Sequence, residues 1–316
     1  MRVGIPKGLL YCKYHPFFKT FFHGLGADIV ESEETNRKIM DLGIQSCVDE
    51  ACLPVKIFHG HVASIRDQCD LLVIPRIMGI CRNEYICPKF CGLPEMVVHS
   101  IPGLPPVTTK PLYMHNEKEL FKWCLSTGLM ITASQRTIRN AFMQAIRAQC
   151  NQQTGYLEPG ASLTVMLAGH PYLLYDEFLN MSIVKKLRSK GIGLVTEEFA
   201  SNRVSQLQLK KLAKKPFWAF QRRLYGAAAA FYEQQKIDGI IYLSSFACGP
   251  DSVIIDLIRY LVKEFPMLVL KLDEHTGEAG LDTRLEAFTD MLERRDVHEN
   301  NHTPPGECLY RSQNPF

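Results

Sequence analysis

The chain has 316 residues, 46% of them hydrophobic, which is enough to bury a large core and favours two domains over one. Its 36 basic and 33 acidic residues are spread along the whole sequence, so no basic face for nucleic acid or a membrane surface is expected. The first residues do not read as a secretory signal, and no apolar run is long enough to span a bilayer. We therefore expect a cytoplasmic protein without nucleic-acid or membrane partners.

The N-terminal part alternates short apolar strands with helical patterns. The predicted elements are strand 2–6, helix 9–25, strand 27–31, helix 35–46 capped by Thr35, helix 55–66 and strand 71–74. Strands that alternate with helices indicate a parallel sheet covered on both faces.

A proline-rich stretch, 100–111, and a helical pattern over 117–148 separate this part from a second alternating series. The second series comprises strands 163–168, 193–196, 239–243 and 267–271, with helices at 176–189, 224–235 and 252–264. The predicted fold is α/β, with two Rossmann-like (flavodoxin-like) lobes that have parallel sheets and are linked by a helical connector. The domain boundaries are 1–110, 111–160 for the connector, 161–295, and 296–316 for a disordered polar tail.

Eleven cysteines in a reducing compartment favour metal or redox chemistry over a disulfide framework. Cys248 follows an apolar strand directly, at the end of a parallel sheet where ligands gather, and we expect unpaired backbone N–H groups to stabilise its thiolate there. Cys52 and Cys87 also precede predicted helix starts, and each of the three has a proline within the next two residues. These three cysteines are the predicted metal ligands.

Thiolate ligands select zinc, copper(I) or iron–sulfur clusters. Zinc is the competing assignment, although the paired Cys-x2-Cys knuckles typical of zinc sites are missing. Cys81 and Cys91 lie close to Cys87 without a neighbouring proline, and whether they are further ligands stays open. The remaining cysteines lie in helical or apolar patterns or in the tail, where a buried or irrelevant thiol is the simpler interpretation: Cys12, Cys47, Cys69, Cys124, Cys150 and Cys308.

The loop 271–280 follows the last strand and gathers acidic side chains, a histidine and two glycines. Glu274 and His275 are its candidates for proton transfer, against the alternative that the loop caps a helix over 283–292. His170 follows strand 163–168 and could donate to a substrate or cluster, or be an ordinary loop histidine; the same caution covers Lys56, His59 and His61. No phosphate-binding loop is present where it would be needed, so ATP, if involved, is expected on another polypeptide.

Several blocks of sequence carry a resemblance to a known family. They are Val-Gly-Ile-Pro-Lys-Gly-Leu-Leu (3–10), Asp-Glu-Ala-Cys-Leu-Pro-Val-Lys (49–56), Tyr-Ile-Cys-Pro-Lys-Phe (85–90), Phe-Ala-Cys-Gly-Pro-Asp-Ser (246–252), Asp-Glu-His-Thr-Gly-Glu-Ala-Gly (273–280) and Thr-Arg-Leu-Glu-Ala-Phe (283–288). With these blocks the chain resembles the uncharacterised domain of proteins related to acyl-CoA dehydratase activases. More distantly, its second lobe is similar to subunits of 2-hydroxyacyl-CoA dehydratases and benzoyl-CoA reductases.

The resemblance implies an iron–sulfur cluster on Cys52, Cys87 and Cys248, either a [4Fe-4S] or a double-cubane cluster. It also implies a separate ATP-hydrolysing iron–sulfur activator as electron donor, and a homodimer or a heterodimer with a related subunit. The expected function is a low-potential electron-transfer or reductase component. The alternatives are a dehydratase subunit that acts on an acyl-CoA, with Glu274 or His275 transferring protons, and a non-enzymatic cluster scaffold.

Overall fold

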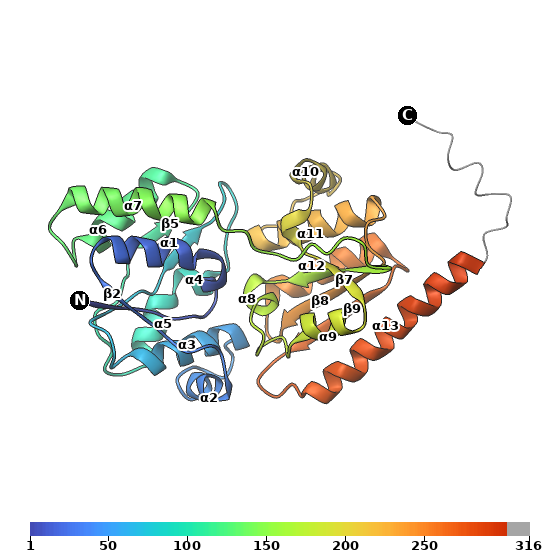
Figure 1. The fold of residues 1–316 in the computed structure, drawn as a ribbon, viewed down its shortest axis with the longest axis horizontal. Helices are drawn as coiled ribbons and strands as arrows, with labels where there is room; N and C mark the ends of the chain where they lie inside the picture. The colour runs from blue at the N-terminus through green and yellow to red at the C-terminus, as the bar shows by residue number, and fades with distance from the viewer. Residues whose placement is uncertain (302–316) are drawn as a thin grey trace.

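A computed structural model describes residues 1–301, with side chains as far as Arg295, and consists of two lobes side by side (Figure 1). The strands form three sheets, and neighbouring strands within each sheet run parallel. Helices follow the strands in both lobes, which confirms the predicted α/β class with Rossmann-like lobes.

The first lobe contains a three-stranded sheet in the order β2-β1-β3 and a two-stranded sheet of β4 and β5. Its elements are β1 (Arg2–Ile5), α1 (Tyr11–Gly24), β2 (Asp28–Glu31), α2 (Arg37–Gln45), α3 (Leu53–Ile65), β3 (Leu71–Leu72), β4 (Arg76–Gly79), α4 (Pro88–Cys91), α5 (Leu93–Ser100) and β5 (Pro111–Tyr113). The cap of α2 differs from the prediction, because the side chain of Asn36, and not that of Thr35, accepts the Ile39 N–H.

The predicted helical connector forms α6 (Glu117–Gly128) and α7 (Gln135–Cys150), and it packs against the first lobe. Trp123 of α6 lies with its ring 5.8 Å from that of Phe18 in α1, and Phe142 of α7 lies 6.5 Å from Phe17. Such aromatic pairs contribute a large buried apolar area. The two helices therefore form a layer of this lobe and shield α1.

The second lobe has a four-stranded sheet in the order β7-β6-β8-β9. Its elements are β6 (Leu163–Gly169), α8 (Pro171–Leu174), α9 (Ile183–Ser189), β7 (Ile192–Val195), the 3-10 helix η1 (Glu197–Phe199), α10 (Asn202–Lys210), α11 (Ala219–Glu233), β8 (Gly239–Ser245), α12 (Gly249–Val262), β9 (Met267–Leu272) and α13 (Glu278–Asn301). Side chains alternate along the strands, so Leu167 and Ile241 pack with α9 and α13 while Met166 and Ile240 pack with α11 and α12. Helices thus cover both faces of the sheet.

Several element boundaries in this lobe differ from the prediction; the helix expected over 224–235, for example, begins at Ala219. The helix expected over 176–189 begins only at Ile183, because the Asp176 carboxylate accepts the N–H groups of Phe178 and Leu179 and holds a turn there. Helix α13 continues to Asn301, six residues into the tail predicted to start at 296. The rest of the predicted tail, 302–316, and Cys308 lie outside the described residues.

The two lobes share an apolar core. Ile39 and Met40 of α2 and Leu53 and Ile57 of α3 are buried within the core of the second lobe. The helices α2 and α3 cross at Gly43 and Gly60, where an added Cβ would lie 2.1 Å from the Lys56 carbonyl oxygen or 1.9 Å from that of Ile39. This close crossing fixes the start of α3, where Cys52 lies, against the second lobe.

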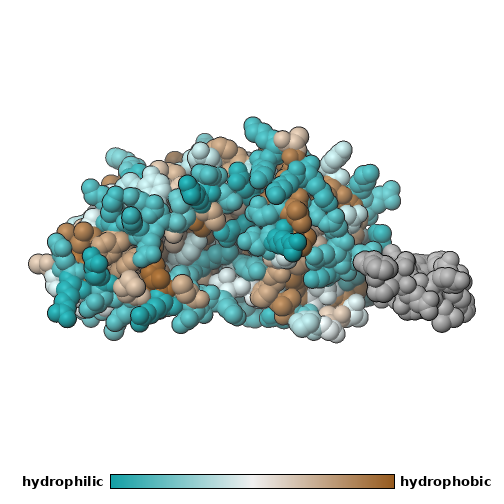
Figure 2. Space-filling model, turned by 90° about the horizontal axis from the view of Figure 1, so that it is seen from above, coloured by the Kyte–Doolittle hydropathy of each residue, from teal (hydrophilic) through white to brown (hydrophobic). Residues whose placement is uncertain are grey.

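Figure 2 shows a largely hydrophilic face on which apolar side chains gather only in small groups. No helix within residues 1–301 has both the length and the apolar character that crossing a bilayer requires.

Candidate metal centre at the lobe junction

Two side chains of the second lobe lie where its strand order reverses. In the order β7-β6-β8-β9, the strands β6 and β8 are neighbours whose connections leave to opposite sides, and ligands of open α/β sheets bind at such a point. His170 directly follows β6, and Cys248 lies three residues beyond β8. Gly169 enables this placement, because its φ is +147° and an added Cβ would lie 2.4 Å from the Leu243 carbonyl oxygen.

The residue before Cys248 has an uncommon backbone conformation. Ala247 has a φ of +62°, in the left-handed region that residues with a Cβ seldom adopt. The N–H of Cys248 donates to the Ser245 carbonyl oxygen at 3.1 Å and closes this turn. Such conformations persist only where the surroundings impose them, and they cluster at functional sites.

The first lobe contributes Cys52 and Cys87, each at the start of a helix. Cys52 is the N-cap of α3 and Cys87 the N-cap of α4, just as Cys248 is the N-cap of α12. Each helix has its proline within the first two positions, where the fixed φ of proline suits a helix start. The predicted placement of all three cysteines at helix starts is confirmed.

The three cysteines and His170 line one cavity between the lobes, about 110 Å³ in volume, which we call the cysteine cavity. Aromatic side chains form much of its remaining wall: Tyr85, Tyr172, Trp218 and Phe220. The ring of Tyr85 stacks on Phe217 at 4.3 Å, and the Tyr85 carbonyl oxygen accepts the Ala219 N–H at 2.8 Å. This contact closes the loop before Cys87 onto the start of α11.

Burial controls the protonation of these thiols. Burial raises the pKa of Cys87, and burial together with the Asp251 carboxylate raises that of Cys248. The expected stabilisation of the Cys248 thiolate by backbone N–H groups is present but outweighed, since the Asp251 N–H lowers this pKa less than burial raises it. Without a cation the Cys248 and Cys87 thiols are neutral at pH 7, and a bound metal would displace their protons.

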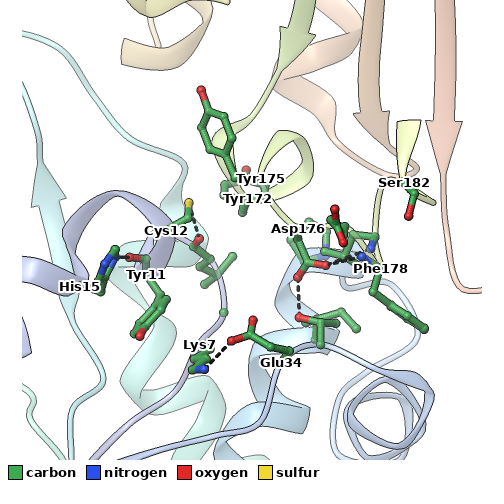
Figure 3. Close-up of a pocket in the computed structure, with 17 residues that line it drawn as sticks. Lys7, Tyr11, Cys12, His15, Glu34, Tyr172, Tyr175, Asp176, Phe178 and Ser182 are labelled. Atoms are coloured by element: carbon green, nitrogen blue, oxygen red, sulfur yellow. Dashed lines mark hydrogen bonds and ion pairs between the residues drawn. The ribbon is translucent and has the colours of Figure 1, made fainter. Parts of the chain in front are cut away.

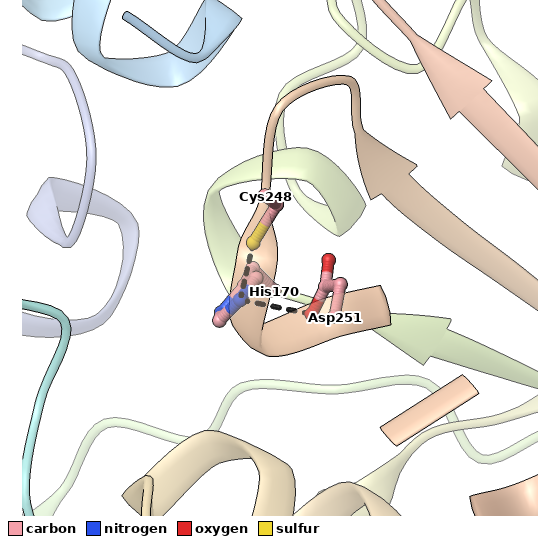
Figure 4. A group of neighbouring side chains, drawn as sticks. All are labelled: His170, Cys248 and Asp251. Carbon is pink, nitrogen blue, oxygen red and sulfur yellow. Dashed lines mark hydrogen bonds and ion pairs between the residues drawn. The ribbon is translucent and has the colours of Figure 1, made fainter. Parts of the chain in front are cut away.

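His170 connects the cysteine cavity to a buried acid. Its Nε2 lies 3.2 Å from Asp251 Oδ1 and 3.9 Å from Cys248 Sγ (Figure 4). Both contacts are made by the same ring nitrogen, so the three residues do not form the Cys–His–Asp arrangement of a nucleophilic enzyme, in which the two ring nitrogens face different partners. Their ligand atoms lie within 4.8 Å of one another, and the group could hold a metal ion.

The other predicted candidates lie away from the cysteine cavity. Glu274 forms an ion pair with Lys56, and His275 is exposed, so neither proton-transfer candidate lines that cavity. Cys91 donates its thiol to the Ile77 carbonyl oxygen, and Cys81 accepts from Arg223 in a separate cavity. The structure thus brings together the three predicted cysteines and His170, and it leaves the other candidates outside.

A larger cavity of about 670 Å³ lies between the lobes, and the sequence analysis missed it. Its walls come from the loops after β1, β2 and β6 and from the first turns of α1 and α3 (Figure 3). Tyr172 lines both this cavity and the cysteine cavity. The signal that could have found it is the convergence of three strand ends, which is where open α/β folds bind ligands.

A chain of hydrogen bonds beside the larger cavity reaches from the first lobe to the second. Within the first lobe the Lys7 N–H donates to Ser32 Oγ, and Thr35 donates to the Asp176 carboxylate of the second lobe. Between them, His61 Nδ1 lies 2.9 Å from Ser32 Oγ, and its Nε2 lies 3.1 Å from Thr35 Oγ1. Because the Thr35 proton goes to Asp176, His61 must donate from Nε2 and accept at Nδ1; burial lowers its pKa to about 4, which keeps it neutral.

The fold and the site define the class of protein: a two-lobed parallel α/β protein with a candidate metal centre at the lobe junction. The family model of the CoA enzyme activase uncharacterised domain matches residues 2–199, and the chain belongs to this family. The match includes Cys52, Cys87 and His170, whereas Cys248 lies beyond it. No curated protein matches the chain in sequence.

Proposed function

We propose that the chain is an iron–sulfur protein that holds its cluster on Cys52, Cys87 and Cys248 and works as a low-potential electron-transfer or reductase component. The observation that carries this proposal is the convergence of three thiols, far apart in sequence and supplied by both lobes, on one aromatic-walled cavity. Such a cluster would supply single electrons. The chain itself would hold the ligands and exclude water, two of the properties that set cluster potential.

The spacing of the sulfur atoms favours a polynuclear cluster over zinc. Tetrahedral zinc with Zn–S bonds of about 2.3 Å holds its sulfur ligands about 3.8 Å apart. Among the described residues, the three cysteine sulfurs do not form a group within 4.8 Å of one another. The three sulfurs are therefore not arranged around a single zinc ion, and the shared cavity leaves room for a cluster with several irons between them.

The family supports an ATP-hydrolysing activator as the electron donor. The family description names a CoA enzyme activase, and this sequence has no phosphate-binding loop of its own. We infer that ATP is hydrolysed on a separate iron–sulfur protein that docks near the cysteine cavity. A dimer that shelters this face is part of the same proposal.

The larger cavity is the place where this component would hold a small electron acceptor, because it adjoins the cysteine cavity through Tyr172. Its charges are unsuited to the phosphates of CoA. Its one lysine, Lys7, pairs with Glu34, and two further carboxylates, Asp176 and Glu177, line the wall. This disfavours the dehydratase alternative for that cavity and favours a compact neutral or cationic acceptor.

Anaerobic reconstitution with iron and sulfide tests the proposal. We expect the wild-type chain to retain iron, sulfide and a visible absorbance, and the variants Cys52→Ala, Cys87→Ala and Cys248→Ala each to lose most of all three. Cys91→Ala is the matched control, because Cys91 is half-buried in the same lobe as Cys52 and Cys87 but does not line the cysteine cavity. A colourless wild-type chain without iron would reject the proposal.

Two further assays separate the alternatives. Acetyl-CoA binding measured by calorimetry would favour the dehydratase subunit over the electron-transfer component. Rapid transfer of the cluster to an apo-ferredoxin, without any electron transfer, would favour the scaffold. The electron-transfer proposal expects neither result, and it expects cluster reduction by a purified activator only when MgATP is present.

A further inference from the structure

His170 shares its position in the fold with the three cysteines. It follows a parallel strand, is the N-cap of a helix, α8, and has Pro171 as the next residue. The three cysteines are likewise N-caps, of α3, α4 and α12, with a proline at the first or second helical position. All four side chains line the cysteine cavity, and each comes from a different loop.

The environment of Asp251 sets the tautomer of His170. Asp251 is fully buried, and its Oδ1 accepts from the Tyr242 hydroxyl at 2.9 Å and from the Gln221 amide at 3.3 Å. His170 Nε2 lies 3.2 Å from the same oxygen and 3.3 Å from the Gln221 amide nitrogen, so the amide and the carboxylate compete to set its role. A carboxylate is a strong acceptor, so Nε2 carries the proton and donates it to Asp251. The other ring nitrogen, Nδ1, is then left with its lone pair.

Nδ1 of His170 is buried and accepts no hydrogen bond from any described residue. A buried polar atom left unpaired costs about 1–3 kcal/mol, so such an atom calls for a function. The ring is held between Tyr172, stacked at 4.9 Å, and Phe220, in edge contact at 5.2 Å. A carboxylate that fixes one ring nitrogen while the other is offered to a metal is the usual support of a metal-binding histidine.

Asp251 itself is unsuited to direct ligation through Oδ1. That oxygen already faces three donors, from Tyr242, Gln221 and His170. A metal bound there would have to displace them from a fully buried site. The other oxygen, Oδ2, is buried without a hydrogen-bond partner among the described residues, but Asp251, unlike His170, does not line the cysteine cavity. Its place behind His170 therefore favours Asp251 as the residue that positions His170 over Asp251 as a ligand.

We propose that His170 is the fourth protein ligand of the cluster and binds through Nδ1, which gives the chain a ligand set of three cysteines and one histidine. This inference rests on the proposed function, because it assumes the cluster on the three cysteines. Replacement of a thiolate by a neutral imidazole removes a negative charge from the centre and raises its reduction potential. The His170 ligand would thus distinguish this centre from an all-cysteine cluster.

Pulsed EPR of the reduced, reconstituted wild-type chain tests the assignment without any variant. We expect a strong nitrogen hyperfine coupling that changes from the 14N to the 15N pattern when histidine is supplied as the 15N isotope. His170→Cys should retain iron, lose the coupling and have a lower potential. His59→Gln is the matched control, since His59 is also buried with an unpaired ring nitrogen but does not line the cavity.

The outcomes separate the inference from the proposed function. Iron and sulfide in the wild-type chain without a histidine coupling would overturn the His170 assignment and leave the cysteine cluster standing. A coupling that persists in His170→Cys would overturn the assignment as well. A wild-type chain that binds no iron would overturn both.

Discussion

Replacing Glu274 by glutamine removes the carboxylate that faces the buried ammonium group of Lys56. The side chain of Lys56 is 3% exposed and that of Glu274 is 15% exposed, so neither charge is well solvated. The pair joins the first turn of α3, the helix that Cys52 caps, to the loop after β9, and it therefore ties the two lobes together. The variant keeps the volume and one acceptor oxygen and changes little besides the charge.

The expected cost is about 3–5 kcal/mol in the free energy of unfolding at pH 7. Removing one partner of a buried ion pair typically costs this much, because the other charge is left uncompensated. Lys56→Met combined with Glu274→Gln should recover most of the loss, because no buried charge remains.

Urea unfolding, followed by circular dichroism, gives the free energy of unfolding of the wild type, Glu274→Gln, Lys56→Met and the double variant. These four values form a double-mutant cycle. We also expect Glu274→Gln to release iron to a chelator faster, because the lobes close less firmly over the cysteine cavity. If Glu274→Gln destabilises the chain as much in the Lys56→Met background as in the wild type, the pair is not coupled and the reasoning fails.

The same pair gives a pH dependence with a defined sign. Burial would raise the pKa of Glu274, but the hydrogen bond and charge of Lys56 outweigh it and hold the pKa below the ordinary value of 4.5. The unfolded chain therefore binds this proton more readily than the folded chain. The stabilisation is present above pH 4.5 and is lost as the pH falls through the folded pKa. Glu274→Gln should therefore lose less of its free energy of unfolding than the wild type does over that pH range.

Two further predictions concern the cavity wall and the contact between the lobes. Tyr85→Ala removes the ring that stacks on Phe217. We expect normal iron content under anaerobic conditions but faster bleaching of the cluster absorbance in air. Bleaching at the wild-type rate would show that the ring does not limit the access of oxygen to the cluster. Thr35→Ala leaves the His61 Nε2–H without its acceptor and removes the hydrogen bond to Asp176. It should lower the free energy of unfolding, measured in urea, by about 1–3 kcal/mol. An unchanged midpoint would contradict the proton assignment in that chain of hydrogen bonds.

The sequence alone predicts much of the fold, because apolar strands bounded by turn residues and followed by helical patterns are strong local signals. The positions of the three cysteines at helix starts were also predictable, since Pro54, Pro88 and Pro250 mark those starts. The predicted helix over 176–189 fails in its first half. There the Asp176 side chain competes with the helix for backbone N–H groups, and the periodicity of apolar residues does not report that competition.

The composition of the candidate site was less predictable, because it depends on how the lobes meet. Nothing local to Gly169-His170 distinguishes a cavity-lining histidine from an ordinary loop histidine; Asp251 and the unpaired Nδ1 become visible only in three dimensions. Glu274 shows the reverse case. Its loop had the composition of a proton-transfer site, yet Lys56, distant in sequence, holds the carboxylate in an ion pair between the lobes.

The most direct test of the three-cysteine centre is residue-resolved thiol alkylation, read by mass spectrometry, in the iron-loaded native chain before and after iron is removed with a chelator. We predict that Cys52, Cys87 and Cys248 are protected together in the loaded chain and that all three are alkylated faster after chelation than before it, while the exposed Cys150 reacts at the same rate in both states. Alkylation of any of the three at the rate of Cys150 in the iron-loaded chain would contradict the account.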